Sequence, residues 1–184
     1  GGTASKYYTP YSMFQRQMVI GRNYNFTMPT PPGGPVIERK EDRPWYGLYF
    51  GAAEANLFLA EFKLLGANLP QCAEYYYNRG VRFSVEEYDK LAELNQIAYY
   101  GTTYDYDPHE VSIELKDGEI DTMMENEDYK LTGSAAEQLE KVYIQQMLNY
   151  TLYPDELYVT ARRSGLPKFG SNLISRDNFS LVPV

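Results

Sequence analysis

Residues 51–66 read GAAEANLFLAEFKLLG, and this stretch decides the fold class of the chain. Its apolar side chains recur at intervals of three and four, the spacing of one face of an amphipathic helix: Ala55, Phe58, Leu59, Phe62 and Leu65. Gly66 follows at the position where a glycine commonly ends a helix. The stretch therefore predicts a helix that begins near Gly51 and ends before Gly66.

A second helix is predicted directly after the first. Asn68 and Pro70 are typical of a helix N-terminus, as a capping residue and a first-turn proline. Its apolar face is expected to contain Ala73, Tyr77, Gly80 with Val81, Ser84, Tyr88 and Leu91. Because the link between the two helices is short, we expect them to pack as antiparallel neighbours.

Two more helices are predicted after residue 133. Ser134 and Glu137 have the spacing of a capping box. A wide apolar arc follows, made by Leu139, Val142, Tyr143, Ile144, Met147, Leu148 and Leu152. Pro154 would end this helix and begin the next, which Gly165 and Pro167 would stop. The first turn of that last helix is acidic and its last turn is basic, as the helix dipole favours: Asp155, Glu156, Arg162 and Arg163.

The remaining segments divide the chain into domains. Residues 1–50 are rich in Pro and Gly and are expected to be irregular, whereas residues 51–184 form a helical domain. Residues 99–133 interrupt that domain as an insert, in which alternation at 111–115 and the turn Asp117-Gly118 predict a small β-hairpin. The predicted fold is therefore mainly α, with antiparallel, tetratricopeptide-like helix pairs and long loops.

The composition excludes several classes of protein. The 184 residues carry 17 Lys and Arg against 25 Asp and Glu, a net charge of −8. A nucleic-acid surface needs clustered cations, so we expect no nucleic-acid partner. No uncharged apolar stretch approaches the roughly 18–20 residues that span a bilayer. Hydrophobic residues make up 43% of the chain, which is sufficient for a folded core.

No motif nominates a catalytic site. Cys72 and His109 are the only Cys and His, and neither lies within a motif of a thiol enzyme. Glu54 and Glu61 would share a helix face, as the paired carboxylates of a glycoside hydrolase could. A solvated or salt-bridged pair is the simpler interpretation. Asp105, Asp107 and Glu110 could bind calcium, but the other positions of an EF-hand loop are lacking. We therefore predict that the chain is not an enzyme and holds no metal or cofactor.

Aromatic residues are the informative feature, with 19 Tyr, 8 Phe and 1 Trp. Residues 75–77 are three consecutive tyrosines on a helix that turns about 100° per residue, so they cannot all face one core. Exposed aromatic rings next to polar groups bind sugars by stacking. The candidate ligand-binding residues are Trp45, Tyr99, Tyr100, Tyr104 and Tyr106. The alternative is that these rings fill space between helices and loops.

Two parts of the chain carry a family resemblance. The first has AE at 53–54, LAE at 59–61, AEYY at 73–76 and GVRFS at 80–84. The second has QQ at 145–146, YPDELY at 153–158 and RRSGLP at 162–167. Together they resemble the C-terminal part of the SusD/RagB family of outer-membrane nutrient-binding lipoproteins, in particular its SusD-like members. Tyr158 stands where that subgroup commonly has Trp, and residues 99–133 have no counterpart in it.

The resemblance implies a non-catalytic protein at the bacterial cell surface. Such proteins capture glycans, in some cases peptides, for import through a TonB-dependent (SusC-like) outer-membrane transporter. Family members attach to the extracellular face of the outer membrane only through an N-terminal lipid anchor, which this chain does not contain. We therefore expect a soluble piece of a longer protein, with a glycan or oligosaccharide as ligand. The alternative from a different class is a helical scaffold that binds the transporter or a peptide and no sugar.

Overall fold

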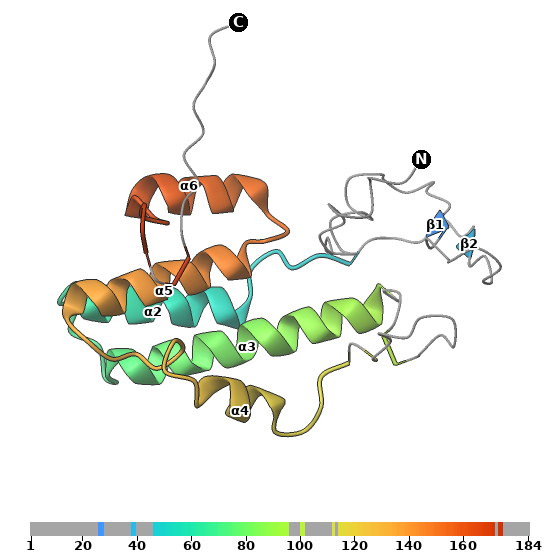
Figure 1. Ribbon diagram of the computed structural model, residues 1–184, viewed down its shortest axis with the longest axis horizontal. Coiled ribbons are helices and arrows are strands. Elements are labelled where there is room, and N and C mark those ends of the chain that lie inside the picture. The colour runs from blue at the N-terminus through green and yellow to red at the C-terminus, as the bar shows by residue number, and fades with distance from the viewer. Residues whose placement is uncertain are drawn as a thin grey trace, which may run out of the picture. The chain divides into compact units, whose positions relative to one another are not determined.

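The fold is mainly α, as predicted (Figure 1). The computed structural model describes residues 46–95, 100–101, 112, 114–171 and 173–174, together with two short strands. Its helices are α2 (Ala52–Leu64), α3 (Ala73–Leu94), α4 (Glu119–Met124), α5 (Ala135–Asn149) and α6 (Pro154–Ser164). Among these described helices, none has both the length and the hydropathy needed to cross a membrane.

The chain forms two compact units. One comprises Gly1–Leu48 and Tyr88–Leu115, and the other comprises Tyr49–Glu87 and Lys116–Val184. The first unit contains strands β1 (Phe26–Thr27) and β2 (Glu38–Arg39), which pair antiparallel with Phe26 opposite Arg39. These strands lie on either side of the Pro- and Gly-rich residues 29–35, within the segment that was predicted to be irregular.

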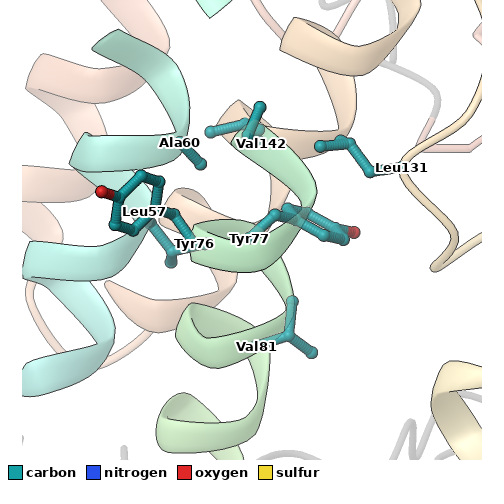
Figure 2. Close-up of a cluster of buried hydrophobic side chains, with 8 residues drawn as sticks. Leu57, Ala60, Tyr76, Tyr77, Val81, Leu131 and Val142 are labelled. Carbon is teal, nitrogen blue, oxygen red and sulfur yellow. The ribbon is translucent and has the colours of Figure 1, made fainter. Parts of the chain in front are cut away.

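The second unit is a stack of helices with a main core and a smaller buried cluster made by Ile144, Met147 and Leu166. In Figure 1, α2 and α3 run antiparallel, α5 lies beside α2, and α6 lies on α5. Figure 2 shows the side chains that fill the space between α2, α3 and α5, with the ring of Tyr77 pointing toward Leu131. The buried members of this cluster are Leu57, Ala60, Ala73, Tyr76, Tyr77, Val81, Leu131 and Val142.

The buried face of α2 differs from the predicted one. Phe62 and Leu65, which were expected inside, are 48% and 62% exposed. The residues that α2 buries are Ala53, Leu57, Ala60 and Glu61. Because α2 is apolar around most of its circumference, the spacing of its apolar residues alone did not distinguish the predicted face from the face that is buried. The face with two alanines is the one that lets neighbouring helices approach closely.

Gly80 marks the closest approach of α3 to α2. A Cβ atom added at Gly80 would lie 2.7 Å from Leu57 Cγ and 3.1 Å from the Leu57 backbone nitrogen. We expect Gly80→Val to destabilise the fold by about 2 kcal/mol, because overpacking forces the helices apart and exceeds the helix propensity gained. Urea denaturation measures this, with Glu86→Val as the control, since Glu86 is at an exposed position of the same helix. Equal stability of Gly80→Val and wild type would contradict the close approach.

The N-terminus of α2 is capped by a residue of α3. Glu87 Oε1 accepts hydrogen bonds from the backbone nitrogens of Ala52 at 2.7 Å and Ala53 at 3.3 Å. Burial, the largest influence, raises the pKa of Glu87. The predicted start of the second helix at Asn68 and Pro70 is wrong, because α3 begins at Ala73. The hydroxyl of Tyr76 accepts a hydrogen bond from the Gln71 nitrogen just before that start.

The predicted β-hairpin at 111–120 is wrong in its second half. Gly118, with φ of +81°, begins α4 instead of turning the chain into a strand. Ile120 lies on α4 and is buried, and Met123, about one turn later, packs against the main core. Of the expected first strand, residues 112, 114 and 115 are described and form no strand, while 111 and 113 lie outside the described residues. The i, i+3 spacing of Ile120 and Met123 is a helical signal within the insert.

The predicted start of α5 and both predicted ends of α6 are confirmed, whereas the predicted end of α5 at Pro154 is wrong, because α5 ends at Asn149 and Leu152 follows it. Ser134 caps α5 with the full capping box, because Glu137 N–H donates to its side chain and Glu137 Oε2 accepts from its backbone nitrogen. Pro154 is the first residue of α6, and Gly165 is its C-cap. Of the arc expected inside α5, Leu148 is the exception, at 44% exposed.

One charged side chain lies at the centre of this unit. Glu61 on α2 is 1% exposed, and Arg163 on α6 donates to both of its carboxylate oxygens. Gln146 on α5 donates to Glu61 Oε2 at 2.8 Å, and Tyr143 donates to Oε1 at 3.1 Å. Three helices therefore meet at one hydrogen-bonded carboxylate. Glu54 and Glu61 were expected to be solvated or salt-bridged; Glu61 is buried and salt-bridged to Arg163.

Candidate functional site

A groove of about 490 Å³ lies between α3 and α4 in the second unit. Its volume is within the range of ligand-binding pockets. The lining residues come from one face of α3, from α4 and its C-cap, and from the turn after α4: Glu74, Tyr75, Asn78, Arg79, Arg82, Asp121, Met124, Glu125 and Lys130. We call this site the α3–α4 groove.

Three consecutive tyrosines of α3 separate into core and groove positions. Tyr77 is fully buried and Tyr76 is 8% exposed, whereas Tyr75 is 43% exposed and lines the groove. This confirms the prediction that residues 75–77 cannot all face the core. The rings of Tyr75 and Tyr76 meet edge to face, with centroids 5.5 Å apart. The ring of Tyr75 is therefore supported from the core side and accessible from the groove.

Arg79 lies between two aromatic rings on the same face of α3. Its Cζ is 5.5 Å from the centroid of Tyr75 and 5.0 Å from that of Phe83. This arrangement follows from the sequence, because residues at i−4 and i+4 stand above and below a helical side chain. Contact with two rings restricts the guanidinium and leaves its N–H edges free to donate.

The other cations of the groove have anionic partners. Arg82 forms an ion pair with Asp121, which ties α3 to α4 across the groove. Lys130 forms an ion pair with Glu127 at 2.5 Å. Three carboxylates and three cations line the groove, so its charges balance although the chain as a whole is acidic. Such a surface offers an aromatic ring together with both donors and acceptors for a polar ligand.

The site residues predicted from the sequence are mostly not described. Trp45, Tyr99, Tyr104 and Tyr106 lie outside the described residues. Tyr100 is described, half-buried, and its hydroxyl donates to Asp89 Oδ2 at 3.1 Å. Burial and the bond to Asp89 raise the pKa of Tyr100 to about 12, so its phenol is a hydrogen-bond donor at neutral pH.

Within the first unit, two side chains near the C-terminal end of α3 bind the chain segments that contain or adjoin the predicted site residues. Asp89 accepts from Tyr100 through one oxygen and from the Leu115 nitrogen, at 2.8 Å, through the other. The side chain of Asn95 accepts from the Tyr46 nitrogen at 2.9 Å and donates to the Tyr46 carbonyl at 2.8 Å. Both side chains are therefore structural supports of their segments.

The residues considered for catalysis or metal binding do not form a site in the described part of the chain. Cys72 is exposed, just before α3, and His109 lies outside the described residues. The calcium candidates Asp105, Asp107 and Glu110 also lie outside them. Among the residues that are described, no three His, Cys, Asp or Glu side chains could hold a metal ion together.

Sequence reasoning located Tyr75 as one of three tyrosines but missed its neighbours in the groove. The signal was the spacing of Tyr75, Arg79 and Phe83, which places one cation between two rings on a helix face. The contribution of α4 was missed because its residues were predicted to be a strand.

A scan against protein-family models finds no match to the chain, and a search of curated proteins finds none either.

Proposed function

We propose that the chain is a non-catalytic carbohydrate-binding protein of the bacterial cell surface. It captures a glycan or oligosaccharide for import through a TonB-dependent outer-membrane transporter. Two observations support the proposal: the resemblance of residues 53–84 and 145–167 to SusD-like proteins, and the α3–α4 groove.

The observation that carries the proposal is the exposed ring of Tyr75 in a groove with balanced charge. The C–H face of a sugar ring packs against an aromatic ring, while its hydroxyls need donors and acceptors at the rim. Asn78 supplies both, and the carboxylate of Glu74 supplies an acceptor, one helical turn or less from Tyr75. A flat apolar ligand would leave these groups unpaired.

Tyr75→Ala is expected to weaken glycan binding by about threefold to tenfold, because stacking on one aromatic ring is worth about 0.5–1.5 kcal/mol beyond burial. Isothermal titration calorimetry with a panel of neutral and acidic oligosaccharides measures the effect. The matched control is Tyr158→Ala on α6, which removes a tyrosine that is 66% exposed and outside the groove. Equal losses for the two variants would contradict a site at Tyr75.

A second candidate function is a protein-interaction scaffold. It is favoured by the exposed face of α6, where Tyr158 and Val159 are 66% and 54% exposed. If no oligosaccharide of the panel binds the wild-type chain, the carbohydrate proposal fails and this second function becomes the better one.

A further inference from the structure

We infer that the α3–α4 groove binds a carbohydrate that carries a carboxylate, a uronate-containing oligosaccharide, through Arg79. This inference rests on the proposed carbohydrate-binding function and names the ligand class of the same groove. Two observations support it: Arg79 lies between two aromatic rings, and the other cations of the groove are already in ion pairs.

Arg79 is the cation of the groove that is left for a ligand. Arg82 is bound to Asp121 and Lys130 to Glu127, whereas Arg79 forms no ion pair with any residue that the structure describes. The side chain is exposed, so its charge is accessible from the groove. A guanidinium without a carboxylate partner is complementary to an anion, which it can bind through two parallel hydrogen bonds.

The rings on either side restrict the geometry of this cation. With its Cζ 5.5 Å from the centroid of Tyr75 and 5.0 Å from that of Phe83, the guanidinium loses less freedom on binding than an unrestrained arginine would. Tyr75 also contributes to the groove itself, so an anion at Arg79 would be next to the ring that stacks a sugar. The two contacts therefore fit adjacent parts of one ligand.

The acids of the groove limit the charge of the ligand. Glu74 and Glu125 line the groove and form no ion pair among the described residues. They would repel a polyanion such as a nucleic acid or a polyphosphate. They would accept hydrogen bonds from hydroxyl groups, which a sugar supplies in number. A ligand with many hydroxyls and an isolated carboxylate satisfies both sets of groups.

The test compares an acid with its own ester. Galacturonate and glucuronate trimers and their methyl esters share the same rings and differ in charge, and calorimetry at pH 7 gives the affinity of each for the full chain. We expect the acid form of at least one trimer to bind about tenfold or more tightly than its ester, because the carboxylate accepts charge-assisted hydrogen bonds from Arg79, which are stronger than those to an uncharged ester. Arg79→Gln is expected to abolish that difference, whereas the exposed Arg162→Gln on α6 leaves it unchanged.

The outcomes separate this inference from the proposed function. If the ester binds as tightly as the acid, or Arg79→Gln weakens both forms equally, the uronate inference is overturned while carbohydrate binding stands. If neither form nor any neutral oligosaccharide binds the wild-type chain, the proposed function itself is overturned. Circular dichroism of Arg79→Gln checks that the variant is folded, and Arg79→Lys, which keeps the charge but loses the two-bond geometry, is expected to retain part of the preference for the acid.

Discussion

Arg163→Met is expected to destabilise the fold by about 3 kcal/mol at neutral pH, the cost of leaving a buried carboxylate without its counter-ion. The carboxylate is Glu61, which is 1% exposed and bonded through both oxygens to Arg163. The side chain of Arg163 is 38% exposed, so water partly screens the pair and places the effect at the lower end of such losses. Urea denaturation of the variant and the wild type measures the difference in the free energy of unfolding.

The effect of this substitution should depend on pH. Burial by itself raises the pKa of Glu61, but the hydrogen bonds and charge of Arg163, with the bond from Gln146, hold it below its ordinary value of 4.5. In the wild type, ionised Glu61 therefore contributes stability above pH 4.5 that is lost as the pH falls through the lowered pKa. Without Arg163, burial dominates, the pKa rises above 4.5, and the protonated form is favoured. The difference between variant and wild type should thus be largest at neutral pH and shrink toward pH 4.

Two further variants test the cause. Arg162→Met removes the neighbouring, exposed arginine of α6 and is expected to change stability by less than about 0.5 kcal/mol. The double variant Glu61→Gln with Arg163→Met removes both charges and should recover part of the loss, because no buried charge remains. A loss in Arg163→Met that is the same at pH 4 and pH 7 would show that the missing packing of Arg163 on Phe58 and Tyr143, and not its charge, causes the effect.

The largest loss of stability is expected from Tyr77→Ala, about 4 kcal/mol, as for other truncations of large aromatic residues in a core. Tyr77 is fully buried and lies in the cluster that joins α2, α3 and α5, against residues such as Leu131 and Val142 (Figure 2). Truncation leaves a cavity that these helices can close only in part. Urea denaturation checks the value, and a loss below about 2 kcal/mol would indicate that the ring is not in the core.

The same substitution two residues earlier is the matched control. Tyr75→Ala removes the same atoms from the same helix, but its ring is 43% exposed, so we expect a loss below about 1 kcal/mol. Tyr77→Phe keeps the buried ring and should cost much less than Tyr77→Ala. A small loss at Tyr75 also shows that any change in glycan binding by Tyr75→Ala comes from the groove and not from unfolding.

The sequence predicted a helix end well where the interactions that form it lie within the same helical turn. The capping box at Ser134 and Glu137, the first-turn Pro154 and the terminal Gly165 were all recognised because each involves residues within one helical turn of its own helix. The start of α3 was predicted too early, because Asn68 and Pro70, which are typical of a helix N-terminus, belong to the link that precedes Ala73. The α4 helix was missed because Asp117-Gly118 is equally compatible with a hairpin turn and with a helix start at a left-handed glycine.

By itself, the sequence determined that the chain is mainly helical and that residues 75–77 cannot all be buried. It also determined where α2 and α6 begin and end. These properties depend on spacing and on contacts between near neighbours in the chain. Only the tertiary structure decided which face of α2 is buried, since that choice depends on Gly80 of α3 and on Arg163 of α6, which are distant in sequence. The groove was decided in the same way, because Tyr75 and Arg79 line one groove with Asp121 and Lys130 only when α4 packs beside α3.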